Sequence, residues 1–147
     1  MSQNRVIKFR AWIKKDNMGK STMFYQGEQY LQSFLSRCVF FSNDEGRDHE
    51  KYGDYELMQF TGLKDKDGKE VYEGDILRYC DNWQFPHPED TSHHLIFWDA
   101  ENARFWDKRL EDGDSLSAYM DQSIEWVSET KVIGNKYANP ELNFTLR

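Results

Sequence analysis

The sequence has few of the features from which a function is usually inferred, and long apolar segments are the first that it lacks. It contains no uninterrupted apolar stretch of about 18 residues, and its mean hydropathy of -0.90 excludes a membrane-spanning helix. The segment from Met1 to Arg10 is polar and basic, without the apolar stretch of an export signal. We therefore expect a cytoplasmic protein that makes no contact with a membrane.

Cysteine and histidine are also scarce. The 147 residues include two cysteines and four histidines. Cys38 and Cys80 lack Cys-x-x-Cys spacing and lie in apolar or strand-like surroundings, so we predict two buried free thiols. Nothing in the spacing of His87, His93, His94 and Cys80 matches a His-x-His or His-x-x-x-His ligand pair. We predict no metal site and no cofactor.

Positive charge is in deficit over the whole chain. There are 19 Lys and Arg residues against 26 Asp and Glu, which gives a net charge of -7, the wrong sign for a protein that neutralises phosphates. The first part differs, because Met1 to Gly53 holds nine basic and six acidic side chains. Nucleic acid is therefore not the expected partner, and single-stranded nucleic-acid binding is kept as the alternative hypothesis. It would use a basic edge made of Arg5, Lys8, Arg10, Lys14 and Lys15.

Catalytic and phosphate-binding motifs are absent as well. Three glycines spaced by six residues form neither GxGxxG nor GxxxxGK[ST], and no GxSxG surrounds any serine. Glu73 and Asp75 could share a strand face as a carboxylate pair, but a solvated turn explains them more simply. We predict that the protein is not an enzyme. The residues of this region are interpreted as turn or bulge residues: Gly62, Asp67, Gly68 and Gly74.

Aromatic residues are plentiful, at 16%, and they lie in segments that alternate as strands do. Between Arg5 and Ile13, alternation places Ile7, Phe9, Ala11 and Ile13 on one face. The dipeptide Asp67-Gly68 predicts a hairpin, because both residues tolerate positive φ, and Glu73-Gly74-Asp75 predicts a sharp bend. The predicted strands include Ser21 to Gln26, Val39 to Phe41, Tyr55 to Thr61, Lys69 to Tyr72, Ile76 to Cys80, His94 to Asp99, Ala103 to Trp106, Ile124 to Val127 and Lys131 to Tyr137.

One or two short helices accompany these strands. Tyr30, Leu31, Phe34, Leu35 and Cys38 recur with helical spacing, which predicts a helix from about Glu28 to Arg37, and a second helix is predicted from Ser115 to Gln122. Residues 43–53 and 81–92 are predicted to be loops and flexible insertions. Because no repeat or linker divides the chain, we predict a single domain over 1–147, mainly β, with antiparallel hairpins closing into a small barrel.

Three stretches taken together resemble the YopX family of bacteriophage and prophage proteins. They are IKFRAW from Ile7, LMQFTGLKDKDGKEVYEGDILRY from Leu57, and VIGNKYANPELN from Val132, with a weaker likeness in HLIFWDAENARF from His94. The resemblance implies a mainly β fold with SH3-like barrel character, carried in bacterial cells by phages or integrated elements. It implies no particular activity. The segments from Tyr25 to Gly53 and from Asp81 to Ser92 lie outside the pattern, and we expect specificity there, because inserted loops tend to carry function.

These observations together favour an accessory protein that binds another protein or itself. Most tryptophans, namely Trp12, Trp98, Trp106 and Trp126, fall in predicted strands and are expected in the core. Trp83 and Phe85 instead lie in a polar, proline-containing loop, where exposed rings are typical anchors for a protein partner. The competing interpretation is that this loop folds its rings back over the barrel. The candidate interaction residues are therefore Trp83, Phe85, Arg5, Lys8 and Arg10.

Overall fold

The computed structural model of the chain describes residues 6–14, 21–42, 55–80, 82–87, 91–110 and 124–145. Its strands are β1 (Phe9–Ile13), β2 (Thr22–Tyr25), β3 (Tyr55–Lys64), β4 (Glu70–Tyr72), β5 (Asp75–Cys80), β6 (Thr91–Asp99), β7 (Arg104–Arg109) and β8 (Lys131–Asn135). The helices are α1 (Leu31–Ser42), the 3-10 helix η3 (Ile124–Glu129) and α2 (Pro140–Thr145).

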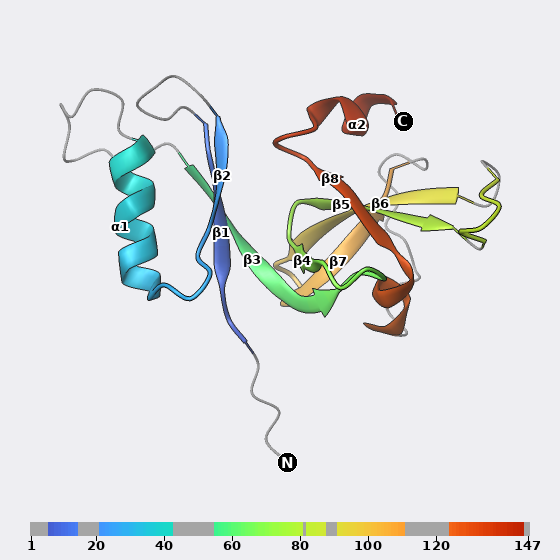
Figure 1. The fold of residues 1–147 in the computed structure, drawn as a ribbon, viewed down its shortest axis with the longest axis horizontal. Coiled ribbons are helices and arrows are strands. Elements are labelled where there is room, and N and C mark those ends of the chain that lie inside the picture. The colour runs from blue at the N-terminus through green and yellow to red at the C-terminus, as the bar shows by residue number, and fades with distance from the viewer. Residues whose placement is uncertain are drawn as a thin grey trace, which may run out of the picture. The chain divides into compact units, whose positions relative to one another are not determined.

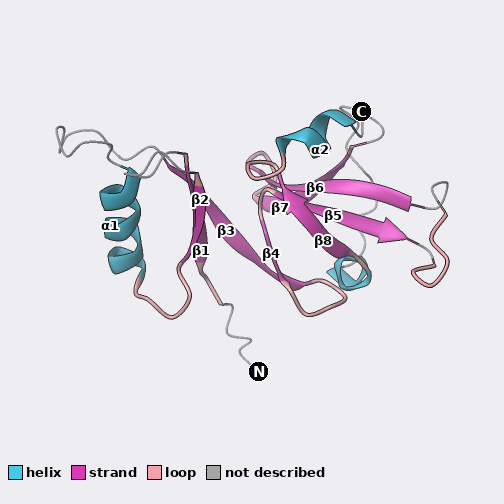
Figure 2. Ribbon diagram, turned by 45° about the horizontal axis from the view of Figure 1, so that its top comes forward, coloured by secondary structure: helices cyan, strands magenta, loops and turns pink. Residues whose placement is uncertain are grey.

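The strands form two four-stranded antiparallel sheets, in the orders β2-β1-β3-β4 and β7-β6-β5-β8 (Figure 1). The prediction of a mainly β protein built from antiparallel hairpins with only short helices is confirmed. Its barrel character lies in the second sheet, which curls into a half-barrel (Figure 2). No helix among the described residues combines the length and the apolar character needed to cross a bilayer.

The chain forms two compact units, Met1–Phe60 and Thr61–Arg147, which are called unit 1 and unit 2 below. Strand β3 belongs to both, because its first six residues lie in unit 1 and its last four in unit 2. The single domain predicted over 1–147 stays a prediction, which unfolding of both units in one transition would support.

The core of unit 1 lies between β1 and α1. Ala11 and Ile13, which alternation assigned to one face, are fully buried with Phe34 and Cys38 of the helix. Phe9, Phe24, Leu35 and Tyr55 pack against this cluster. Ile7, assigned to the same face, precedes the strand and is 60% exposed. Within β1, Phe9, Ala11 and Ile13 follow the predicted face, although Arg10 of the other face is buried as well.

Helix α1 begins and ends later than the sequence predicted. Tyr30 accepts the first helical bond, from the Phe34 N–H at 3.0 Å, so the helix starts at Leu31 rather than near Glu28. The strand predicted from Val39 to Phe41 is wrong, because these residues continue the helix to Ser42. Val39 continues the i, i+4 row of Leu31 and Leu35 beyond Arg37, and this helical period overrides local β propensity.

Unit 2 is organised around the turn between β3 and β4, where Asp65 is buried. Its Oδ1 accepts hydrogen bonds from the N–H groups of Asp67 and Lys69, both at 2.9 Å, and its Oδ2 accepts one from Val132 N–H at 3.0 Å. The turn closes with Gly68 N–H donating to the Asp65 carbonyl at 3.0 Å. Only Gly68 of the predicted pair adopts positive φ, at 82°; Asp67 does not. One carboxylate thus shapes the turn and ties it to β8.

The bend before β5 is held in a similar way. Asp75 is buried, and its Oδ2 accepts the Tyr72 N–H at 2.8 Å. Gly74, at a φ of 86°, donates to the Ile96 carbonyl at 2.7 Å and accepts from the Lys136 N–H at 2.9 Å. The predicted sharp bend is confirmed. Its hydrogen bonds through Gly74 connect it to β6 and to the residue that follows β8.

The segment preceding β8 contradicts the prediction of a strand from Ile124 to Val127. These residues form η3, in which residues three apart lie on the same side. Val127 is buried in the unit 2 core with Val71, Leu77, Ile96 and Val132. Thr130 is also fully buried and donates from N and Oγ1 to the Val127 carbonyl, at 3.1 and 2.7 Å. The helix predicted from Ser115 to Gln122 and the loop predicted over 43–53 lie outside the described residues.

The two aspartates of the β3–β4 turn provide a matched test of this arrangement. We expect Asp65→Ala to lower the free energy of unfolding by about 3 kcal/mol or more, because it leaves three buried or partly buried N–H groups without an acceptor. Asp67→Ala should cost less than about 0.5 kcal/mol, because its side chain is 54% exposed and forms a surface ion pair with Lys66. Equal effects of the two substitutions in urea denaturation would contradict the role of Asp65.

Cys38 provides a test of the unit 1 core. Burial raises the pKa of its thiol above the ordinary value, although the nearby Arg37 acts in the opposite direction. A raised pKa leaves less thiolate at neutral pH, and the side chain is fully buried. We expect Cys38 to resist iodoacetamide in the native protein and to react once the chain is unfolded in urea. Rapid alkylation of the native protein at Cys38, located by mass spectrometry, would show that this core is open.

Candidate interaction site

Trp83 is packed against the end of η3 within unit 2. Its Nε1 donates to the Glu129 carbonyl at 3.1 Å, and the Lys66 Nζ lies 4.9 Å from the centroid of its ring. Lys66 is held in turn by its own N–H, which donates to the Thr130 carbonyl at 2.8 Å. This is the folded-back arrangement that competed with the anchor interpretation, and it fixes the loop of residues 82–87 against η3.

Phe85, two residues further on, is placed differently. Its ring is 66% exposed, and its backbone N–H donates to Asn82 Oδ1 at 3.2 Å. Gln84 N–H donates to the same oxygen at 3.0 Å, so one asparagine side chain fixes the turn. The structure therefore separates the two loop aromatics, with one ring used in packing and the other presented to solvent.

The described members of the expected basic edge lie in three different environments. Arg10 is only 2% exposed. Lys8 lies over the Phe60 ring, with Nζ 4.8 Å from the centroid. Lys14 forms an exposed ion pair with Glu56 at 3.3 Å. Arg5 and Lys15 lie outside the described residues. Of the described cations in the expected basic edge, Arg10 thus contributes no charge to the surface, and the charge of Lys14 is paired with that of Glu56.

Three glycines of the central region adopt positive φ, namely Gly62, Gly68 and Gly74. Gly62 does so inside β3, where the preceding Thr61 Oγ1 donates to the Val71 carbonyl at 2.6 Å and accepts the Leu63 N–H at 3.2 Å. A strand residue at positive φ is typical of a bulge. These positions shape the backbone. Within the described part of the chain, no group of three or more His, Cys, Asp or Glu side chains is arranged to hold a metal ion.

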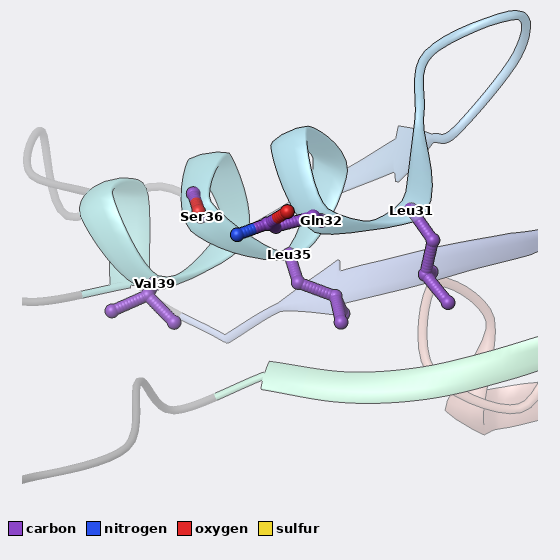
Figure 3. A pocket seen from close by; sticks show the side chains of 5 residues that line it. All are labelled: Leu31, Gln32, Leu35, Ser36 and Val39. Atoms are coloured by element: carbon purple, nitrogen blue, oxygen red, sulfur yellow. The ribbon is translucent and has the colours of Figure 1, made fainter.

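Helix α1 presents a partly exposed apolar surface beside its buried face, and the sequence analysis missed this surface. Leu31, Leu35 and Val39 form one row along the helix, and Gln32 and Ser36 lie in the next row (Figure 3). Together they line an open hollow of about 540 Å³. Phe40 extends the second row and is 68% exposed, and Tyr30, just before the helix, is 85% exposed. We call these residues the α1 surface: Tyr30, Leu31, Gln32, Leu35, Ser36, Val39 and Phe40.

Exposed large apolar side chains are concentrated in unit 1. Seven of the nine found among the described residues belong to it, and only Phe85 and Trp98 belong to unit 2. Scattered single residues of this kind are normal, whereas a cluster marks an interaction site. Three of the seven, Tyr30, Leu31 and Phe40, lie on α1 or directly before it, and the remaining four are Val6, Ile7, Tyr25 and Leu57.

A sequence signal for this surface did exist. Helical spacing identified Tyr30, Leu31, Phe34, Leu35 and Cys38 as one buried face, but only Phe34 and Cys38 are fully buried. The informative feature is the lack of charge, because Leu31–Ser42 contains Arg37 as its single charged residue. That guanidinium lies 4.6 Å from the Phe24 ring centroid. A helix at the surface normally carries charges on its outer side, so their absence indicates a binding face.

Comparison with known proteins now accounts for the fold. The sequence profile of the family described as YopX protein matches residues 8–142, nearly the whole chain and both units. The chain belongs to the YopX family. Among solved structures, this YopX protein is similar to protein EF1440 from Enterococcus faecalis, at 25% identity and a TM-score of 0.53, with 98% of this chain and 100% of that chain covered. No curated protein matches it.

The two aromatic residues of the 82–87 loop should differ in their effect on stability. Trp83→Ala removes a hydrogen bond to Glu129 and the contact with Lys66, so we expect it to lower the free energy of unfolding by roughly 1–2 kcal/mol. Phe85→Ala removes an exposed ring and should change it by less than about 0.5 kcal/mol. Thermal unfolding followed by circular dichroism measures both, and the reverse order would show that the loop is not packed through Trp83.

Proposed function

We propose that this YopX protein is an accessory module that acts by binding, and that it associates with a second copy of itself through the α1 surface. The observation that carries the proposal is the apolar row of Leu31, Leu35 and Val39 along an open hollow, on a helix that has one charged residue and also exposes Phe40. Unit 2 has two exposed large apolar residues in its described part, and they lie in separate segments.

The shape of the α1 surface suits a second identical helix. Leu31, Leu35 and Val39 are spaced four residues apart and form a ridge, and the smaller Ser36 lies in the adjacent row beside the hollow. Ridges of i, i+4 residues pack into the grooves of another helix, most often at a crossing angle of about -50°. In a two-fold symmetric dimer, the ridge of each copy would enter the groove of the other.

The chemistry of the surface favours the same occupant. The central parts of protein interfaces are depleted in charge and enriched in aromatic residues. The α1 surface follows this pattern, with two aromatic residues and no charged residue, so two copies brought together there would not repel each other. Gln32 and Ser36 carry donors and acceptors that can pair with their counterparts across a two-fold axis.

Binding of single-stranded nucleic acid is less well supported by the arrangement. It requires cations on an open face beside aromatic rings that bases can stack on. Of the cations proposed for that role, Arg10 is buried and Lys14 is paired with Glu56. The proposal therefore rests on association between proteins.

The solution mass of the protein tests self-association directly. At micromolar concentration, we expect twice the chain mass of 17.6 kDa in sedimentation velocity. Phe40→Ser should weaken the dimer by at least about 100-fold, because burial of a phenylalanine contributes roughly 1.5–3 kcal/mol and a two-fold dimer buries the ring twice.

Phe85→Ser is the matched control, because Phe85 is 66% exposed where Phe40 is 68% exposed. It removes the same ring from unit 2 and should leave the dimer intact. A monomeric native protein at all accessible concentrations would overturn the proposal. So would a dimer that Phe85→Ser weakens and Phe40→Ser does not.

A further inference from the structure

Unit 2 contains a serine, a histidine and an aspartate joined in a continuous chain of hydrogen bonds. Ser92 Oγ lies 2.8 Å from His94 Nε2, and His94 Nδ1 lies 2.6 Å from Asp107 Oδ2. Ser92 and His94 are two residues apart on β6, so their side chains share one face of the sheet. Asp107 comes from β7, where its register partner is Ile96, which places it on the same face, one pair away from His94.

The direction of the hydrogen bonds follows from the chemistry of the groups. An ionised carboxylate only accepts, so His94 Nδ1 donates to Asp107. In a neutral imidazole, Nε2 is then the acceptor, and the Ser92 hydroxyl donates its proton to it. This is the arrangement in which a histidine serves as a base for a serine hydroxyl and a carboxylate holds the ring in the required tautomer.

The surroundings of the aspartate and the histidine increase the effect of this contact. Asp107 is fully buried, His94 is 4% exposed, and Asp107 Oδ1 has no hydrogen-bond partner among the described atoms. The contact between His94 Nδ1 and Asp107 Oδ2 therefore lies in the interior, where an electrostatic contact is stronger than in water. The Trp126 ring contacts His94 edge-on, with centroids 4.9 Å apart, and helps to fix the imidazole plane.

Ser92 is the most accessible of the three hydrogen-bonded residues. It is only partly buried, whereas His94 and Asp107 lie in the interior. Its register partner on β5 is Tyr79, and Arg109 of β7 is paired with His94. Because register partners share a face, a phenol and a guanidinium flank the serine and histidine on the two neighbouring strands. A cation in this place can stabilise negative charge that develops on a bound acyl oxygen.

We propose that Ser92 is a nucleophilic serine that takes up an acyl group from small activated esters. The Ser92 oxygen attacks the ester carbonyl carbon, a new C–O bond forms, and His94 Nε2 takes the hydroxyl proton. When the tetrahedral intermediate collapses, the bond to the ester alkoxide breaks, and the proton passes from His94 to the departing alcohol. The products are an acylated Ser92 and one alcohol, with Asp107 acting as a positioning residue throughout.

The inference goes beyond the proposed binding function and is independent of it. The α1 surface lies in unit 1, whereas all three residues of the hydrogen-bonded chain lie in unit 2. The proposal concerns covalent modification of one serine, so it requires a nucleophile, a base and an orienting carboxylate, and all three are present. Failure of self-association would leave it unaffected.

An alkyl fluorophosphonate tests the nucleophile in the full-length protein. Ser92 displaces fluoride from phosphorus, which forms a stable phosphonate ester and a mass shift that peptide mass spectrometry assigns to one residue. We expect Ser92 to be labelled about 100-fold faster than Ser36, an exposed serine of α1, because a positioned base contributes at least that factor. Ser92→Ala should remove the label without loss of the far-ultraviolet circular dichroism spectrum.

Two further variants distinguish a reactive serine from a hydrogen-bonded chain with a purely structural role. His94→Gln should slow labelling of Ser92 by about 100-fold, and Asp107→Asn by at least about tenfold. Labelling of Ser92 in the wild-type protein no faster than that of Ser36 would overturn the proposal, whether or not the buried variants fold. Unchanged labelling in a folded His94→Gln protein would overturn it as well.

Discussion

The carboxylate of Asp65 is the interaction on which the rest of unit 2 depends. It accepts three backbone N–H groups, and one of them, from Val132, lies 67 residues away in the sequence. A buried carboxylate is costly unless its oxygens are hydrogen-bonded, and bonds to an ionised acceptor are stronger than neutral ones. The same carboxylate therefore favours the turn that bonds it locally and the register of β8 that completes its bonding. Lys66 and Trp83 extend this contact to η3 and to the 82–87 loop.

The stretches that carry the family resemblance contain mainly residues that direct the backbone. Asp65, Gly68, Gly74 and Asp75 hold the turns around β4. In the last stretch, Asn139 Oδ1 accepts the Asn135 N–H at 3.2 Å, and a Cβ on Gly134 would come within 2.6 Å of that oxygen. The α1 surface lies outside these stretches, in the segment from Tyr25 to Gly53, and so do Ser92 and Asp107, whereas His94 begins the stretch of weaker likeness. In this protein, the recognisable sequence thus encodes the scaffold.

The sequence predicted local features well and long-range contacts poorly. Alternation identified β1, and Asp67-Gly68 identified the hairpin, because both depend on neighbouring residues. The burial of Arg10 and the bond from Asp65 to Val132 depend on elements distant in sequence, so no local pattern indicated them. The strands predicted at Val39 and at Ile124 failed because packing of a helical face and of Val127 overrode β propensity.

The candidate sites illustrate the same difference. Ser92 and His94 have the spacing that places them on one strand face. The hydrogen-bonded series is complete only with Asp107, whose position is set by the pairing of β6 with β7. The exposed apolar side of α1 could have been recognised from the lack of charged residues in the helix. Helical spacing alone indicated only an amphipathic helix. Trp83 and Phe85 are alike in sequence and differ in structure, because only Trp83 reaches a carbonyl of η3.

Hydrogen exchange at the amide of Val132 measures the central contact most directly. If the Asp65 carboxylate holds β8 to the turn, this amide should exchange as slowly as that of Ile96 in the central strand β6, since both would open only when unit 2 unfolds. Exchange as rapid as at Gln84, whose amide bonds to Asn82 in an exposed loop, would contradict the account.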